Sequence, residues 1–144
     1  MTDTDTHPLY SVIEIYNSAW NRHDVNAILA LHTEDSVFCN HTSGGEAVGH
    51  DAIRQIITGV FEIFPDIHFD LRRLYVRDDL VVQEWTATAT HCNPITYNNK
   101  TLHPTGKRIQ WNGMDILPMR NGQVVRKDVY AESLSFFKQL GASI

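Results

Sequence analysis

The sequence predicts an α+β protein: three N-terminal helices pack on one face of a curved, mainly antiparallel sheet, and a short helix ends the chain. In residues 8–22 and 51–64, apolar residues recur with the 3.6-residue period of amphipathic helices. After Pro65 the period changes to two, which is typical of strands with one buried face. Helices come first and strands later, and this order favours α+β over alternating β and α units. We therefore expect a single domain over residues 1–144, with a structured core over residues 8–141.

Three helices are predicted in the first half of the chain. The first covers residues 8–22 and carries an apolar stripe at helical spacing: Leu9, Val12, Ile13, Tyr16, Ala19 and Trp20. The second covers residues 25–32, after Asp24, whose side chain is a good N-cap. The third covers residues 51–64 and ends before Pro65, because a residue that precedes proline disfavours the helical conformation.

The strands are predicted in five segments: residues 36–40, 67–76, 80–91, 107–119 and 123–131. The last two form a hairpin around Asn121-Gly122. Residues 92–106 are rich in Asn, Pro, Thr and Gly and are expected to form an extended loop. A final helix over residues 132–140 ends at Gly141.

Composition excludes several classes of function. The net charge of −5 argues against a nucleic-acid-binding surface, which needs a basic stripe. The apolar runs are too short to span a bilayer and no apolar leader opens the chain, so we expect a cytoplasmic protein with free thiols at Cys39 and Cys92. The eight histidines include no HExxH motif, and no nucleotide-binding motif is present, so no metal or cofactor is predicted.

One carboxylate lies on an apolar strand face. Asp115 shares its face, by period-two alternation, with four apolar residues: Ile109, Trp111, Leu117 and Met119. Charged groups are rarely buried without a partner or a purpose. Desolvation would raise the pKa of this carboxyl group, making it a neutral acid or an unusually strong base. The alternative is a structural pairing of Asp115 with a buried arginine or with His91.

Six phrases of the sequence carry a family resemblance: YNSAWNRHD, FPDIHFDL, TATATH, HPTGKRI, MRNGQVVRKD and FFKQLG. With the order of elements, they resemble the SnoaL-like polyketide cyclases, which belong to the wider nuclear transport factor 2-like fold. The resemblance runs from about residue 8 to residue 141. It implies a cone open at one end, with the sheet wrapped around a pocket and the first helices closing it. The fold hosts cyclases, isomerases, epoxide hydrolases and plain binding domains, so it implies an architecture rather than a reaction.

Two relatives can be compared residue by residue. Ketosteroid isomerase has a helix-one tyrosine that matches Tyr16 and an oxyanion-binding aspartate that matches Asp115, but its catalytic base falls on Asn40. Limonene epoxide hydrolase has an arginine and an aspartate at positions that are Trp85 and Ala87 here. Its water-holding asparagine also matches Asn40, and its tyrosine is Phe38.

The polyketide cyclases carry an acid/base aspartate on the last strand. Counting without gaps places it at Val129, and Asp128 reaches that position only through a one-residue bulge. The alternative for Asp128 is a solvated ion pair within Arg126-Lys127-Asp128. The cyclases also carry a histidine at the position of Asp115. The sequence therefore lacks the complete catalytic set of ketosteroid isomerase, of the epoxide hydrolase and of the polyketide cyclases. Only the position of the pocket within the fold is implied by the resemblance.

These comparisons predict a small cofactor-free enzyme that moves protons on a hydrophobic, ring-containing carbonyl compound, by aldol-type cyclisation or isomerisation. Asp115, alone or with His91, is the expected acid/base group, and Asp128 is a second candidate. Asn40 and Tyr16 are expected to hold the carbonyl or enolate oxygen. Five side chains are expected to bind the substrate: Phe38, Trp85, Trp111, Trp20 and Leu117.

Two other functions stay open. The pocket could hold a small apolar ligand without changing it, or Asn40 could position a water molecule that opens an epoxide. His41 and His103 are placed in loops beside the mouth. A homodimer is expected, because the fold commonly buries its outer sheet face and four apolar residues are predicted there: Val76, Val82, Met114 and Ile116. We expect no nucleic-acid or membrane partner.

Overall fold

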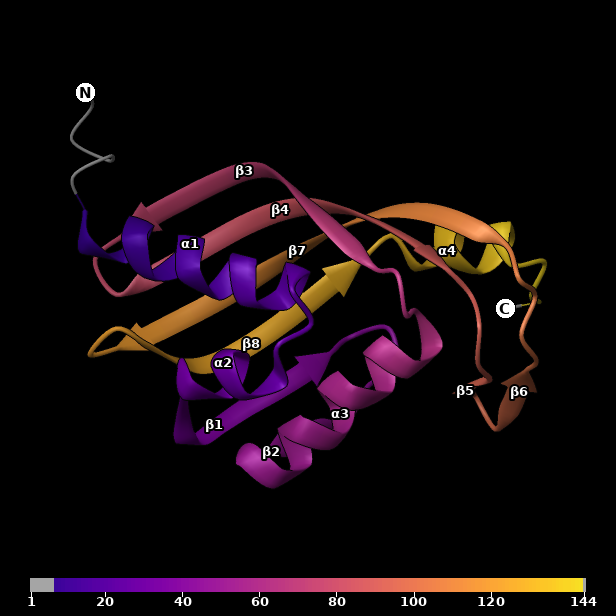
Figure 1. Cartoon of the computed structure of the whole chain (residues 1–144), viewed down its shortest axis with the longest axis horizontal. Helices are drawn as coiled ribbons and strands as arrows, with labels where there is room; N and C mark the ends of the chain where they lie inside the picture. The colour runs from indigo at the N-terminus through magenta and orange to yellow at the C-terminus, as the bar shows by residue number, and fades with distance from the viewer. Residues whose placement is uncertain (1–6, 144) are drawn as a thin grey trace.

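Six strands form one open sheet that arches over the N-terminal helices in the computed structural model, which describes residues 7–143 (Figure 1). The spatial order is β2-β1-β8-β7-β4-β3. The bounds are β1 His32–Asn40, β2 Glu46–Val48, β3 His68–Arg77, β4 Leu80–Thr90, β7 Arg108–Arg120 and β8 Gln123–Ala131. All neighbours pair antiparallel except β1 and β8, which are parallel. The sheet is therefore mixed, mainly antiparallel and not closed into a barrel.

Four helices complete the fold. They are α1 (Pro8–Asn21), α2 (Val25–Ala30), α3 (His50–Ile63) and α4 (Ser133–Gln139). Figure 1 shows α1 lying across the concave side of the long strands, α2 and α3 beside β1, and α4 near the far end of β7. The Asp24 carboxylate accepts the N–H of Ala27, so the expected cap of α2 forms. No helix in the described part of the chain has the length and apolar character needed to cross a membrane.

Three local features differ from the sequence prediction. Helix α2 ends at Ala30, and β1 already begins at His32, because His32 pairs with Val124 of β8. The short strand β2 was not predicted. Residues 92–106 are not a plain loop, since they contain the hairpin of β5 (Ile95–Tyr97) and β6 (Lys100–Leu102). Positive φ angles at Asn98 and Asn99 suit the tight turn between these strands.

Register irregularities decide which side chains face inward. In β3 the pairing with β4 shifts between Leu71 and Arg73, and this shift reverses the alternation beyond it. Val76 consequently pairs with the fully buried Val81 on the inner face, so its predicted place on the outer face is wrong. A second shift separates Ile116 from Met119 in the β7–β8 pairing.

Candidate functional site

A cavity of about 620 Å³ lies between the concave sheet face and the helices. Residues from α1, α3, β1, β3, β4, β7 and β8, together with the first residues of α4, line it. Its walls are mostly apolar and aromatic, and they include Trp20, Phe38, Phe64, Phe69, Trp85, Trp111 and Phe136. Two exposed lining residues, His68 and Asp70, mark the rim along the edge strand β3. This size and character suit a small hydrophobic ligand.

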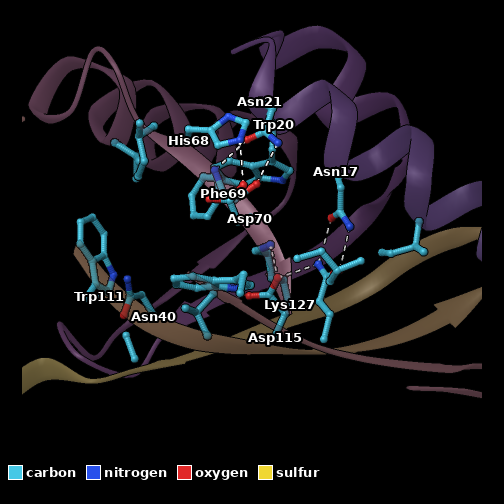
Figure 2. Close-up of a pocket in the computed structure, with 18 of the residues that line it drawn as sticks. Asn17, Trp20, Asn21, Asn40, His68, Phe69, Asp70, Trp111, Asp115 and Lys127 are labelled. Carbon is cyan, nitrogen blue, oxygen red and sulfur yellow. Dashed lines mark hydrogen bonds and ion pairs between the residues drawn. The ribbon is translucent and has the colours of Figure 1, made fainter. Parts of the chain in front are cut away.

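Four polar side chains form a connected row inside this apolar cavity. Lys127 Nζ donates to Asp115 Oδ2 over 3.2 Å, and Gln83 Nε2 donates to the same oxygen over 3.0 Å. Gln83 and Asn17 exchange two further hydrogen bonds, of 2.8 and 3.0 Å. Figure 2 shows this row running from Lys127 and Asp115 in the sheet to Asn17 on α1.

Strand register places the row. Asp115 on β7 is the direct cross-strand partner of Gln83 on β4 and of Val129 on β8. Lys127 lies two residues before Val129 on the same inward face and pairs with Phe38 of β1. Gln83, Asp115 and Lys127 therefore lie side by side on the neighbouring strands β4, β7 and β8, and the backbone pairing of these strands fixes their positions.

Lys127 is enclosed by aromatic rings. Its Nζ lies 5.0 Å from the ring centroid of Tyr16, 4.8 Å from that of Trp20 and 5.8 Å from that of Phe38. These distances allow cation–π attraction, which is strongest where water is excluded. Only 7% of the Lys127 side chain and 3% of the Asp115 side chain are exposed, so the ion pair is buried.

Electrostatics favour an ammonium group at Lys127. Burial by itself lowers the pKa of Lys127, but the Asp115 carboxylate and the Tyr16 hydroxyl outweigh it and hold that pKa above its usual value. The Lys127 ammonium lies 3.2 Å from Asp115 Oδ2, so the two side chains form a buried ion pair. Asp115 Oδ1 is buried and has no hydrogen-bond partner among residues 7–143. Asp115 Oδ2 therefore accepts hydrogen bonds from Lys127 and Gln83, whereas Oδ1 accepts none from residues 7–143.

The partner of Asp115 was missed in the sequence. The expected partners were an arginine or His91, and the actual partner is Lys127. If side chains alternated regularly along β8 from the buried Val124, Asp128 would face inward. If they are counted back by two from the buried Val129, Lys127 faces inward instead. The register shift between β7 and β8 makes the second count correct, and a sequence does not show such a shift.

Tyr16 lies next to this row but does not line the cavity. Its hydroxyl and His32 Nε2 are joined by a hydrogen bond of 2.9 Å. Burial raises the pKa of the Tyr16 hydroxyl. Burial, with help from the nearby charge of Lys127, lowers the pKa of His32 to about 3. Both groups are neutral near pH 7, and Tyr16 supports Lys127 from outside the cavity.

The expected wall residues fall into two groups. Trp20, Phe38, Trp85 and Trp111 line the cavity, whereas Leu117 is fully buried and does not. Asn40 also lines the cavity, and its Oδ1 accepts the backbone N–H of Thr42 over 3.0 Å.

His91 lies apart from Asp115. It follows the end of β4, whereas Asp115 pairs with Gln83 near the other end. His91 Nδ1 accepts the N–H of Thr105 over 3.1 Å and is bonded to the hydroxyl of that residue. β4 and β7 are neighbouring strands that run antiparallel, so the residues opposite His91 lie near the start of β7, whereas Asp115 lies opposite Gln83. The expected pairing of His91 with Asp115 is wrong.

The sequence model of the SnoaL-like polyketide cyclases matches residues 11–140. The chain belongs to the SnoaL-like polyketide cyclase family.

Several solved structures share the fold. AclR from Streptomyces galilaeus, a proposed hydroxylase, is 24% identical, with a TM-score of 0.77 over 94% of this chain and 86% of that one. A proposed SnoaL-like polyketide cyclase from Jannaschia sp. CCS1 is 16% identical, with a TM-score of 0.81 over 97% and 99%. IdmH from Streptomyces antibioticus, a proposed polyketide cyclase, is 20% identical, with a TM-score of 0.75 over 94% and 100%. At these identities the likeness shows the fold. No curated protein sequence gives a significant match.

On the last strand of this SnoaL-like chain, Val129 faces inward at the position where the sequence comparison expected the acid/base aspartate of the cyclases. Val129 also lines the cavity. Asp128 points to the outer face, where it bonds with His41 over 2.9 Å and with Arg126 over 2.8 Å, as the ion-pair alternative predicted. The register shift between Val124 and Asp128 leaves Asp128 on the outer face, so Asp128 does not line the cavity. Three acidic residues line the cavity, and of these Asp115 is buried whereas Glu14 and Asp70 are exposed.

Gly113 makes room for Trp85, which lines the cavity. It pairs with Trp85, and a Cβ atom at position 113 would meet the Trp85 indole at 2.3–2.8 Å. A glycine is therefore required for the indole to lie against the neighbouring strand. The Phe69 ring then packs edge-on against Trp85, with the ring centroids 5.2 Å apart.

Proposed function

We propose that this SnoaL-like protein is a small cofactor-free enzyme that transfers protons on a hydrophobic, ring-containing carbonyl compound, in an aldol-type cyclisation or an isomerisation. One observation carries the proposal: a buried carboxylate with one free oxygen lies on the inner face of a large apolar cavity. The aromatic walls support the choice of a planar, multi-ring substrate.

Asp115 is the proposed base. Its Oδ2 is fixed by Lys127 and Gln83, which orients the carboxylate and leaves Oδ1 for a proton on the carbon next to the substrate carbonyl. A side-chain movement that opens Oδ1 to the ligand is part of this proposal, since that oxygen is covered in the free protein. After the transfer, the protonated Asp115 can return its proton to another atom of the substrate.

Lys127 is the proposed stabiliser of the enolate. An ammonium group that keeps its proton and sits in a dry cavity stabilises a developing negative oxygen more strongly than it would in water. Asn40 is proposed as a further donor. It lines the cavity and its Oδ1 accepts the N–H of Thr42, which leaves the amide nitrogen to donate to a ligand. Tyr16 acts through Lys127 as a positioning residue.

Deuterium exchange tests the proposal without knowledge of the natural substrate. The probe is 2-tetralone, a fused two-ring ketone whose C–H groups next to the carbonyl exchange in D₂O when a base removes the proton. We expect the wild type to accelerate this exchange, and Asp115→Asn to lower the accelerated rate by about 100-fold or more while 2-tetralone still quenches the tryptophans of the cavity.

Asp128→Asn is the matched control, because that acid lies on the outer sheet face and should leave the exchange unchanged. If Asp115→Asn exchanges as fast as the wild type, Asp115 is not the base. If the wild type binds 2-tetralone but never exceeds the exchange rate in buffer, the cavity is a binding module for such ketones.

A further inference from the structure

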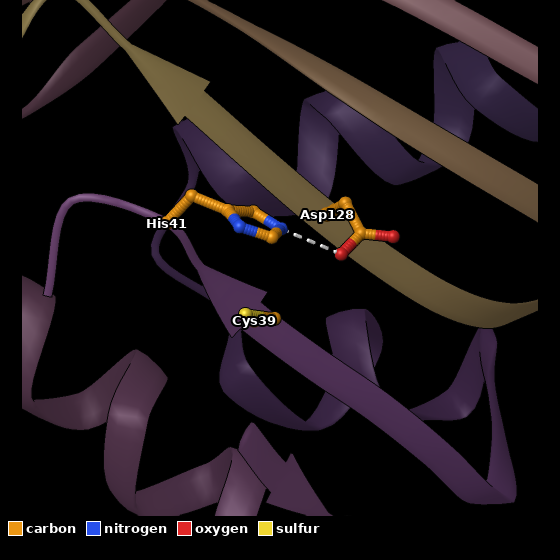
Figure 3. A group of neighbouring side chains, drawn as sticks. All are labelled: Cys39, His41 and Asp128. Atoms are coloured by element: carbon orange, nitrogen blue, oxygen red, sulfur yellow. Dashed lines mark hydrogen bonds and ion pairs between the residues drawn. The ribbon is translucent and has the colours of Figure 1, made fainter. Parts of the chain in front are cut away.

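A second cluster of reactive side chains lies on the outer face of the sheet, away from the cavity. Cys39 and His41 are two residues apart at the end of β1, so they project to the same side. Asp128 on β8 is the direct cross-strand partner of Cys39. The N–H of His41 donates to the carbonyl of Val129, which continues the pairing with β8 past the end of β1. Figure 3 shows the three side chains gathered between the two strands.

The three side chains offer a sulfur, a nitrogen and an oxygen atom within 4.8 Å of one another. Bonds of about 2.0–2.3 Å around a tetrahedral Zn²⁺ place neighbouring ligand atoms about 3.5 Å apart. Side-chain rotation must therefore shorten the longest distance between the three ligand atoms by about 1 Å. The His41 ring is already oriented by its bond to Asp128 and by stacking on Tyr130, with the centroids 4.0 Å apart and an interplanar angle of 7°. The set is therefore close to a binding geometry.

From this geometry we infer that Cys39, His41 and Asp128 form a binding site for a divalent transition metal, with Zn²⁺ the best match. Thiolate and imidazole are ligands that favour Zn²⁺ over Mg²⁺ or Ca²⁺. Cys39 is buried and His41 is one-third exposed, so the ion would enter from the His41 side and keep a water molecule there. Asp128 either binds the ion or holds the His41 ring from behind, as carboxylates beside zinc-bound histidines do.

Arg126 competes with the metal for Asp128. Its guanidinium donates to both Asp128 oxygens, over 2.8 and 3.1 Å, and to Glu46 over 2.8 Å. A metal must share Asp128 with this fixed cation, so removal of the guanidinium should strengthen binding. That behaviour distinguishes a metal site from an ordinary ion-pair network, which Arg126→Gln would only weaken.

The site has a direct connection to the cavity. Asn40 lies between Cys39 and His41 on the strand, and its side chain projects to the opposite face and lines the cavity. Asn40 Oδ1 also accepts a hydrogen bond from the backbone N–H of Thr42, another residue that lines the cavity. A metal bound by Cys39 and His41 would therefore fix the backbone that carries two cavity-wall residues.

Cobalt binding tests the site directly. Co²⁺ added to the whole reduced protein should produce the intense near-ultraviolet absorption of a cobalt–thiolate bond, and Zn²⁺ should abolish it. We expect Cys39→Ser and His41→Gln to lose this band. Cys92→Ser, which removes an exposed thiol elsewhere, should keep it. His68→Gln should also keep it, because His68 pairs with Asp70 at 3.2 Å in the same manner but has no thiol in that pair.

Two further measurements use Zn²⁺ itself. Zn²⁺ should raise the Tm of the wild type and of Cys92→Ser but not of His41→Gln, since only a ligand of the folded state stabilises it. Arg126→Gln should bind Zn²⁺ about tenfold more tightly than the wild type. A cobalt band that is absent from the wild type, or that survives in both Cys39→Ser and His41→Gln, would overturn the inference.

Discussion

The most consequential single residue in the cavity is Lys127. A buried ion pair usually costs more in desolvation than it returns in attraction, and apolar residues of similar size often stabilise a protein better. This chain nevertheless places Lys127 and Asp115 together among aromatic rings. Function explains such an arrangement more readily than stability does.

Removal of one member of the pair should be costly. Lys127→Met leaves the Asp115 carboxylate buried without its cation, and we expect the free energy of unfolding to fall by about 3–5 kcal/mol. Lys127→Met combined with Asp115→Leu should recover most of that loss, because no uncompensated charge remains. Urea unfolding of the two single variants and the double variant measures the difference. Equal losses in Lys127→Met and the double variant would argue against a coupled pair.

His32 should make the fold sensitive to acid. Its pKa is lowered to about 3 in the folded state, against an ordinary value of 6.5. Between these two values the unfolded chain binds a proton that the native His32 does not, so stability falls as pH falls. From about pH 8 to about pH 5 this residue should cost about 2 kcal/mol.

Unfolding of His32→Gln at the same two pH values isolates that contribution. Glutamine keeps a polar partner for the Tyr16 hydroxyl but does not titrate. The variant should lose about 2 kcal/mol less than the wild type on acidification. An identical loss in both proteins would show that His32 stays hydrated and that its pKa is not lowered by burial.

Strand alternation predicted the inward direction of Asp115 and Trp111, and both line the cavity. The family resemblance pointed to Asn40, which also lines it. The roles of these residues stay predictions. Prediction from the sequence failed for Lys127, which looked like one member of an exposed charged triplet. The inward direction of the Lys127 side chain could be predicted only by assuming that Val129 faces inward and counting back two residues along the strand.

At the scale of strands and helices, the sequence pattern located the four helices of residues 7–143 and the five longer strands, but β1 begins at His32 rather than at the predicted residue 36. The short elements were missed, since β2 and the β5–β6 hairpin contain only three residues per strand and have too few positions to show alternation. The place of Val76 was wrong for a different reason: a register shift in β3 reverses the faces, and propensity carries no signal for it.

The contact between β4 and β7 at Gly113 gives a prediction at this scale. Gly113→Ala places a Cβ atom within 2.3–2.8 Å of the Trp85 indole, so the indole must leave the strand or the strands must separate. We expect a loss of about 1–3 kcal/mol in the free energy of unfolding and a changed tryptophan emission spectrum. Trp85→Leu should restore most of the stability of Gly113→Ala. If Gly113→Ala alone is neutral in both measurements, the close packing of Trp85 on β7 is wrong.

At the scale of the whole molecule, no helix of residues 7–143 covers the outer face of the open sheet (Figure 1). We propose that this face forms a homodimer. Val82, Met114 and Ile116 are half-buried there, and Tyr75 and Tyr130 are 59% and 45% exposed. Sedimentation at micromolar concentration should give about twice the 16.4 kDa chain mass. Ile116→Lys should shift the protein to the monomer, and a monomeric wild type would contradict the proposal.

The overall architecture was predictable because three of the four helices of residues 7–143 precede Pro65 and four of the five longer strands follow it, which favours helices layered on a sheet. The volume of the cavity was not predictable, since it depends on how far the sheet curls and on how the side chains of several elements meet.

The most direct test of the central claim is a crystal structure with 2-naphthol, the aromatic counterpart of the enol of 2-tetralone. The account predicts that the fused rings lie between the aromatic walls of the cavity, with the naphthol oxygen within hydrogen-bond distance of Lys127 Nζ or the Asp115 carboxylate. A naphthol bound elsewhere, or in the cavity with its oxygen turned away from both residues, would contradict it.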